Sequence, residues 1–330
     1  MARSSVASSR EGIKNSAVTS FQPRVAFLGT PEPAVSSLKA LAGRCRVHAV
    51  FCGPDRPQGR GRVVEAPPVK RAANKLGLEI HQPEKWNLDS TKLLWDSLNI
   101  DMALVVAYGH ILPSWMIDGC RLGVWNLHFS LLPRWRGAAP VNHAILAGDA
   151  ETGVSLMKIT PGMDAGPVLA QRKRPITMQS VADALLAELA EDAASLLQTN
   201  LETIFSGSAD VCPQDEKLVT LAPKLKKEMA RLDLTRGAVE LHRQIRAFQP
   251  WPGAEFQLDG TVIKVLEAGS IMISDAPPGT LTWDKGGVRL SAGAGDAIEL
   301  IMLQRPGKPA QSAGQVMQFW GTKGAIALLG

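Results

Sequence analysis

The sequence predicts an α/β fold: a Rossmann-like domain with a largely parallel sheet, followed by a small C-terminal β-barrel (OB-like) domain. Strand-like and helix-like segments alternate from residue 24 to about residue 208, whereas short strand-like runs follow residue 251. With 330 residues, 45% of them hydrophobic, the chain can bury one large and one small core. We therefore expect a first domain at 23–208, a linker at 209–221 and a second domain at 222–330.

The first half of the larger domain reads as alternating strands and helices. Short apolar runs predict strands at 24–29, 46–52 and 78–82. Apolar residues at helical spacing predict helices at 33–43 and 69–77. Strands joined through helices by short connections are typical of a largely parallel sheet.

The second half of this domain contains the most apolar strand and the clearest helix. The segment 101–109 is continuously apolar, as expected for a strand covered on both faces. The segment 180–205 keeps leucines at near-helical spacing, and Ser180 can cap its first turn. Further strands are expected at 124–130, 153–159 and 167–170.

The second domain is expected to begin with a helix and to continue as strands. Residues 234–248 form the predicted helix, and glycines separate short β-like runs from Trp251 onward. Evenly spaced short strands suggest a small barrel.

The composition excludes several classes of protein. The four cysteines form no CxxC or CxxH spacing, so we expect buried thiols in a reducing compartment rather than disulfides or a zinc site. No apolar run is long enough to span a bilayer, so no membrane association is expected. The net charge of +5 is compatible with a polyanionic partner and does not establish one.

Residues 1–22 are expected to be a disordered tail, because serine and small residues dominate them. The alternative is an organelle transit peptide, suggested by the arginines, the serines and the single acid Glu11. A secretory signal is excluded because no hydrophobic core follows the basic residues. A tail would fit a cytoplasmic bacterial protein, and a transit peptide would fit a mitochondrial or plastid one.

Three polar side chains mark a candidate active site. Asn126 and His128 lie two positions apart at the end of a predicted strand, so they project from the same face. Ligands of parallel sheets collect at the carboxyl ends of strands. Asp164 lies in the turn PGMDAG (161–166), which can bring its carboxylate beside the imidazole.

This set of side chains suits the transfer of an acyl group to an amine. Attack on a carbonyl carbon makes its oxygen negative, and the Asn126 amide and a protonated His128 can each stabilise that oxygen by about 3 kcal/mol. Asp164 can orient the imidazole and accept the proton of the amine through water. Each residue alone is more often structural, and their combination brings the catalytic interpretation level with the structural one.

The motifs around these residues resemble those of the methionyl-tRNA formyltransferase family. The central motif is Asn126-Leu127-His128 with SLLPRWRGAAP (130–140), and GDAETGV (148–154) and MDAG (163–166) follow it. The resemblance runs from residue 24 to at least residue 253 and is weaker in the barrel. Further blocks are GTPE (29–32), DRPQGRGR (55–62), VVAYGHILP (105–113), LAPKLKKE (221–228), IRAFQPWPG (245–253) and LQRPGKPA (303–310).

The resemblance implies an enzyme that transfers a formyl group from 10-formyltetrahydrofolate to the α-amino group of methionine on initiator tRNA. It implies no metal, no obligate protein partner and a monomer. Asn126, His128 and Asp164 match the family's catalytic residues. The residues that match its folate-binding segments are Tyr108, Gly109, Ile111, Leu112, Ser130, Leu131, Leu132 and Pro133.

The resemblance also assigns tRNA contacts to basic residues. The block 55–62 resembles the family's loop that enters the acceptor end of the tRNA, where Arg pairs with phosphate and Gly lets the loop adapt. Composition alone would favour a solvated loop. The chain departs from the family at Leu221 and Leu234, near the domain junction. The predicted tRNA-binding residues are Arg56, Arg60, Arg62, Lys224, Lys226 and Lys227.

Three alternatives are kept. A formyltransferase that acts on a small amine, such as glycinamide ribonucleotide or an amino sugar nucleotide, would lack the basic block 55–62 and the barrel, and both are present here. A catalytically inactive RNA-binding relative would have lost the three catalytic positions, which are all in place. A nicotinamide-dependent oxidoreductase would need a GxGxxG fingerprint, and the sequence after the first strand is GTPEPA.

Overall fold

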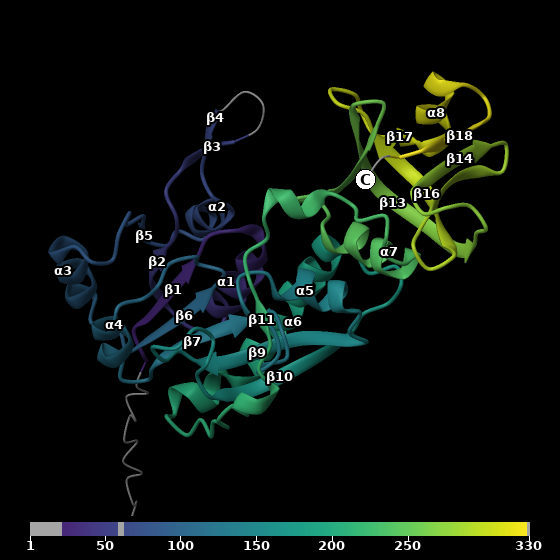
Figure 1. Ribbon diagram of the computed structural model, residues 1–330. Coiled ribbons are helices and arrows are strands. Elements are labelled where there is room, and N and C mark those ends of the chain that lie inside the picture. The colour runs from purple at the N-terminus through teal and green to yellow at the C-terminus, as the bar shows by residue number, and fades with distance from the viewer. Residues whose placement is uncertain (1–21, 59–62, 329–330) are drawn as a thin grey trace, which may run out of the picture.

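The computed structural model describes residues 22–58 and 63–328, which form two domains (Figure 1). The first domain contains a seven-stranded sheet with the order β10-β9-β7-β6-β1-β2-β5. Strands from β5 to β7 run parallel, whereas β9 and β10 are antiparallel at one edge. The strands are β1 (Val25–Gly29), β2 (Val47–Phe51), β5 (Ile80–His81), β6 (Met102–Val106), β7 (Val124–His128), β9 (Glu151–Lys158) and β10 (Val168–Pro175).

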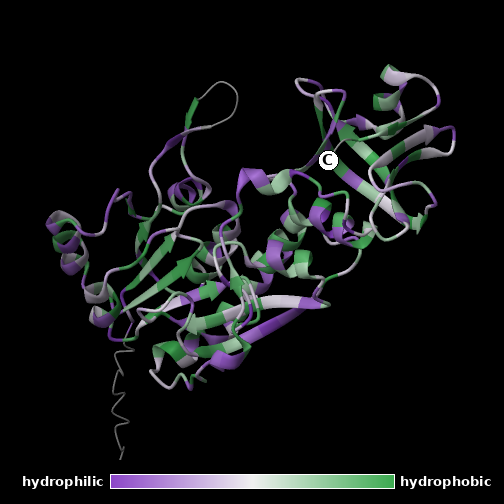
Figure 2. Cartoon of the chain, in the orientation of Figure 1, coloured by the Kyte–Doolittle hydropathy of each residue, from purple (hydrophilic) through white to green (hydrophobic). Residues whose placement is uncertain are grey.

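Helices cover both faces of this sheet. Their apolar sides fill one core on each face, so the central strands are buried on both sides. This explains the continuous apolar sequence of strands such as β6, green in Figure 2. The first face holds α1 (Val35–Ala42), α2 (Pro68–Lys75), α5 (Pro140–Ala147) and α6 (Ala182–Phe205), and the second holds α3 (Asp89–Leu98) and α4 (Ser114–Gly119).

Two local expectations differ from the structure. Only Ile80 and His81 of the predicted strand 78–82 form ladder pairs. Ser180 does not cap α6, because its hydroxyl accepts a hydrogen bond from the backbone N–H of Thr177 at 2.9 Å in the preceding turn. Local hydrogen bonding of serine to a nearby backbone group competes with helix capping, and the Ser180 hydroxyl binds the turn rather than the helix terminus.

The second domain is a curled antiparallel sheet, so the predicted fold class is confirmed as a half-barrel. The strand order is β12-β13-β16-β15-β14-β18, with β17 beside β16. The register of β13 against β16 shifts at three places, and such bulges bend a sheet. The elements are α7 (Ala238–Ala247), β12 (Ala254–Leu258), β13 (Thr261–Ile273), β14 (Thr280–Asp284), β15 (Gly287–Ser291), β16 (Asp296–Gln304), β17 (Gln311–Ser312), α8 (Ala313–Met317) and β18 (Gly324–Ala327).

Helix α7 joins the two domains. Leu241 lies in the core of the second domain, and Ala247, at the end of the helix, lies in the core of the first. The buried Arg246 donates through Nη1 to the backbone carbonyls of Thr177 (3.1 Å) and Ser180 (2.8 Å) in the first domain. A buried guanidinium needs such partners, so these bonds hold the domains in one arrangement.

Acidification should destabilise the protein through His242. This imidazole is buried on α7, and its Nδ1 accepts a hydrogen bond from Arg246 Nε at 3.1 Å. Burial and then the charge of Arg246 hold the pKa of His242 below its ordinary value of 6.5. The unfolded chain therefore takes up the proton first. The contribution of the neutral His242 to the free energy of unfolding is fully present above the ordinary pKa of 6.5. It is lost as the pH falls through the lower pKa that His242 has in the folded protein.

The measurement is the thermal unfolding midpoint, Tm, from neutral to mildly acidic pH. We expect the decline of Tm to be smaller in His242→Gln than in the natural chain, because the glutamine oxygen can accept from Arg246 and does not titrate. An equal decline in both proteins would assign the pH dependence to other groups.

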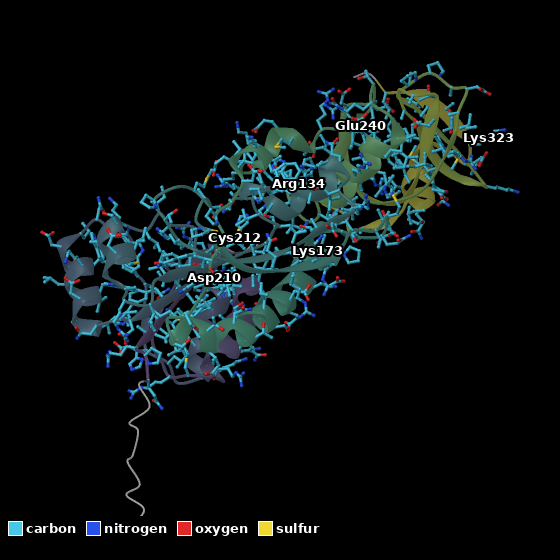
Figure 3. The ribbon with its side chains drawn as sticks, turned by 90° about the horizontal axis from the view of Figure 1, so that it is seen from below. Arg134, Lys173, Asp210, Cys212, Glu240 and Lys323 are labelled. Carbon is cyan, nitrogen blue, oxygen red and sulfur yellow. The ribbon has the colours of Figure 1, made fainter. Side chains whose placement is uncertain are left out.

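The segment 209–221, expected as a linker, packs against the first domain. Cys212 forms a β-bridge with Val168, and β11 (Leu221–Ala222) pairs in parallel with β8 (Arg136–Gly137). Figure 3 shows Asp210 and Cys212 on the first domain, whereas Glu240 and Lys323 mark the second. The segment has no periodic apolar pattern and therefore reads as a spacer, although hydrogen bonds fix its course.

Candidate active site

A cavity of about 500 Å³ opens where the chain order of the sheet reverses. The chain runs outward from β1 to β2 and β5 and then returns to β6 on the other side of β1. Residues that follow β1 (Thr30–Glu32), β2 (Gly53, Pro54) and β6 (Tyr108–His110) line the cavity. Ligands of such sheets bind at this reversal point, outside the carboxyl ends of the strands.

Strand β7, the neighbour of β6, carries two of the predicted catalytic residues. Asn126 lies opposite Val105 of β6 and is half-buried. Among the described residues, no hydrogen bond uses its side-chain amide, so this donor is open to a ligand. His128 is 6% exposed, and its Nε2 lies 2.9 Å from the carbonyl oxygen of Trp135. Because a carbonyl only accepts, Nε2 carries a proton, and Nδ1 is the nitrogen left for chemistry.

The turn between β9 and β10 brings Asp164 to this nitrogen. Asp164 Oδ2 lies 3.7 Å from His128 Nδ1 and accepts a hydrogen bond from the backbone N–H of Gly137 at 2.9 Å. The φ angle of Asp164 is +48°, a left-handed conformation that aspartate tolerates better than most residues. The structure therefore brings together the carboxylate and the imidazole that the sequence paired.

The predicted folate-binding segment 130–133 is tied to the sheet by hydrogen bonds. The Ser130 hydroxyl donates to the carbonyl of Arg134 at 2.6 Å, and Ser155 on β9 donates to the carbonyl of Ser130 at 2.6 Å. The backbone N–H of Leu132 donates to Ser155 Oγ at 3.0 Å, and Gln171 Nε2 donates to the carbonyl of Leu132 at 2.8 Å. Sequence reasoning missed Ser155 on β9 and Gln171 on the edge strand β10, because single polar residues in strands carry no distinctive pattern.

The predicted folate-binding residues are divided between surroundings. Tyr108 and Gly109 line the 500 Å³ cavity, whereas Leu131 lines another cavity, of about 410 Å³. Ile111 is 95% exposed, and a side chain added at Gly109 would meet nothing within 4 Å. The loop after β6 therefore offers an apolar side chain and open backbone to a ligand. Ser130, Leu132 and Leu112 are buried, and Pro133 is half-buried.

Tyr108 is anchored by its hydroxyl group. It is 4% exposed, and its oxygen accepts a hydrogen bond from the indole N–H of Trp86 at 3.1 Å. Burial raises the pKa of Tyr108 to about 12, so the hydroxyl stays protonated at neutral pH. The anchor fixes the start of the loop that carries Gly109 and Ile111.

The predicted tRNA-binding residues that the structure describes lie on two parts of the molecule. Arg56 belongs to the hairpin of β3 (Arg56–Gln58) and β4 (Val63–Glu65) and lines the 500 Å³ cavity, while Arg60 and Arg62 lie outside the described residues. In the view of Figure 1, this hairpin and the second domain extend on the same side of the first domain. Lys224, Lys226 and Lys227 are exposed where the chain enters the second domain.

Two kinds of site are absent from residues 22–58 and 63–328. Across these ranges, no cluster of three or more His, Cys, Asp or Glu side chains could hold a metal ion. Within the same part of the chain, none of the helices combines the length and apolar character that crossing a bilayer requires.

Comparison with known proteins identifies the class to which this fold and site belong. Residues 24–201 match the formyl transferase family, and residues 224–319 match the formyl transferase C-terminal domain. The chain belongs to the formyl transferase family.

The chain is similar to a methionyl-tRNA formyltransferase from Sorangium cellulosum. The two sequences are 41% identical over 297 residues, which is 89% of this chain and 96% of the relative. This match confirms the resemblance that the motifs indicated.

Two solved structures share the fold. One is an N-formyltransferase from Helicobacter canadensis in complex with folinic acid and dTDP-3-aminofucose, with a TM-score of 0.64, 18% identity and coverage of 86% of this chain and 100% of that chain. The other is HypX from Aquifex aeolicus in complex with tetrahydrofolic acid, with a TM-score of 0.60, 18% identity and coverage of 91% and 48%. At such identities the two structures support the fold alone.

Proposed function

We propose that this formyltransferase transfers the formyl group of 10-formyltetrahydrofolate to the α-amino group of methionyl initiator tRNA. The observation that carries the proposal is the distance of 3.7 Å between Asp164 Oδ2 and His128 Nδ1. His128 lies on β7, which also carries Asn126, whose side-chain amide has no hydrogen-bond partner among the described residues. The relative from Sorangium cellulosum supports the choice of acceptor, because it is a methionyl-tRNA formyltransferase that aligns over both domains. The family resemblance implies a monomer, which we adopt in this proposal, and use in protein synthesis agrees with a cytoplasmic location.

The amine attacks the formyl carbon directly. A C–N bond forms, and the formyl oxygen becomes negative beside the Asn126 amide and the His128 imidazolium, which stabilise it by hydrogen bonds. The proton that the new ammonium sheds passes to the Asp164 carboxylate. The bond from the formyl carbon to N10 then breaks, and N10 takes a proton from His128 Nδ1. Asp164 then returns its proton to His128 Nδ1, which restores the imidazolium. The products are the formamide and tetrahydrofolate.

The loop after β6 supports a folate as donor. A pterin is a flat heterocycle that packs on apolar side chains and exposed backbone, and Ile111 and Gly109 supply both. The two similar structures are complexes with folinic acid and with tetrahydrofolic acid, which agrees with a folate donor here.

The basic residues support an RNA acceptor. Exposed lysines at the domain junction and Arg56 at the cavity can contact phosphates on both sides of an acceptor stem. Such contacts provide affinity and orientation without reading sequence. A small-amine acceptor would require neither group.

Replacing Lys224, Lys226 and Lys227 together with alanine should raise the KM for tRNA and leave the KM for 10-formyltetrahydrofolate unchanged. For each lysine–phosphate pair that the variant removes, the dependence of log(kcat/KM) on log[salt] should become shallower by about 0.7–0.9. The measurement is initial rate against tRNA concentration at several salt concentrations. A matched triple variant at Lys39, Lys85 and Lys285, which are also exposed, should keep the slope of the natural enzyme. Equal changes in both triple variants would remove the junction lysines from the tRNA site.

The direct test of the function is formylation itself. Purified protein is incubated with 10-formyltetrahydrofolate and methionyl initiator tRNA, with methionyl elongator tRNA and an amino sugar nucleotide as parallel acceptors. We expect formylmethionine on the initiator tRNA. Formylation of the sugar nucleotide alone would establish the small-amine alternative instead.

A further inference from the structure

The turn that carries Asp164 is held from outside by Gln214. Gln214 Nε2 donates to the backbone carbonyls of Asp164 at 2.8 Å and of Gly166 at 2.7 Å. Its Oε1 accepts from Arg136 Nε at 3.0 Å. Both ends of this one amide are therefore used, and within the described ranges it is the only hydrogen-bond donor to these two carbonyls.

Arg136 extends the hydrogen-bond network from Gln214 to other residues of the segment 209–221. Arg136 is 6% exposed, and its Nη1 and Nη2 donate to the two carboxylate oxygens of Glu216 at 3.2 and 2.8 Å. Its backbone N–H donates to the carbonyl of Thr220 at 2.9 Å. A buried arginine whose guanidinium binds both Gln214 and Glu216 is a rigid support, because a charged donor that loses its partner in the interior is costly.

The segment 209–221 also binds Trp135, the residue whose carbonyl accepts a hydrogen bond from His128. The Thr220 hydroxyl accepts from the backbone N–H of Trp135 at 2.9 Å. The carbonyl of Trp135 in turn accepts from His128 Nε2, and the N–H of Gly137 binds Asp164. Residues 135–137 therefore lie between the segment 209–221 and both catalytic groups.

We propose that Gln214, supported by Arg136, is a positioning residue for catalysis: it sets the distance from the Asp164 carboxylate to His128 Nδ1. The proposal rests on the proposed function above. Proton transfer is sensitive to small displacements, and a misplacement of about 1 Å costs roughly 10²-fold in rate. The Gln214 amide binds the backbone of the Asp164 turn and the Arg136 guanidinium, so we expect its removal to act through Asp164 and to lower kcat rather than binding.

The test compares Gln214→Leu with Gln244→Leu. Gln244 is a matched control, because its half-buried amide also bridges two backbone carbonyls, those of Met229 (2.9 Å) and Arg231 (3.1 Å), in the second domain. We expect kcat of Gln214→Leu to fall by about 10- to 100-fold, with KM for both substrates within about twofold of the natural enzyme. Gln244→Leu should keep the natural kcat.

Glu216→Gln serves as a second variant, because this side chain is 71% exposed and a glutamine oxygen can still accept one hydrogen bond from Arg136. We expect a smaller fall in kcat, again with unchanged KM. A kcat within twofold of the natural value in both Gln214→Leu and Glu216→Gln would overturn the proposal, as would a rise in KM that accounts for the whole loss. If the natural enzyme itself formylates no methionyl-tRNA, the proposed function fails instead, and the two failures are thereby distinguished.

Discussion

Replacing His128 with alanine should lower kcat by roughly 10²–10³-fold, the usual effect of removing one donor to a developing oxyanion. The loss should fall on kcat because the imidazole also relays the proton between Asp164 and N10. Folate and tRNA binding should persist, since the proposed binding groups belong to other segments. The measurement is steady-state formylation together with the equilibrium binding of each substrate.

His48→Ala is the control for this variant. His48 also lies on a strand of the same sheet, β2, and its Nδ1 lies 3.3 Å from the backbone N–H of Val25. Two strands, β1 and β6, separate β2 from β7, so the kcat of His48→Ala should match that of the natural enzyme. A His128→Ala enzyme with undiminished kcat would dismiss the imidazole from the mechanism.

Gly166→Ala should cost both stability and activity. A Cβ at this position would lie 1.8 Å from the carbonyl oxygen of Lys158, a backbone atom that cannot rotate away. The turn must open to relieve this clash, and overpacking of this kind costs about 1–3 kcal/mol of stability. Opening the turn moves Asp164, so kcat should fall by at least the roughly 10²-fold expected for a 1 Å displacement.

Gly119→Ala separates the general effect of alanine from this clash. Gly119 lies in α4, and a Cβ there would meet nothing within 4 Å. Its Tm should be equal to or higher than that of the natural chain, because alanine favours helix over glycine. If Gly166→Ala shows the same Tm and kcat as Gly119→Ala, the turn does not constrain Asp164.

The regular parts of the fold were predictable from the sequence because they depend on local patterns. A strand such as β6 is buried on both faces, and its continuous apolar run reports that burial directly. Helix α3 was not predicted, although Trp95 is buried and Leu94 and Leu98 are half-buried against the core of the second face. A helix of 10 residues repeats the helical period too few times for the pattern to stand out from the sequence around it.

The candidate site was predictable where function restricts residue types. Asn126, His128 and Asp164 stand out because a polar pair ends a strand and an aspartate occupies a glycine-rich turn. Gln214 did not, because its role depends on a hydrogen bond to a carbonyl 50 residues away in the chain. A glutamine that binds backbone atoms leaves no motif, so only coordinates reveal such a partner. The catalytic role of Asn126, His128 and Asp164 and the grouping of the other predicted residues around one substrate stay predictions.

The course of residues 212–222 bears on how such enzymes can be recombined. The two family matches end at residue 201 and begin at residue 224, so the stretch between them belongs to neither. A chimera joined at residue 208 would import a foreign glutamine, threonine and β11 next to the reacting groups. A crossover after Ala222 would keep the native Gln214, Thr220 and β11 beside the catalytic groups while exchanging the second domain.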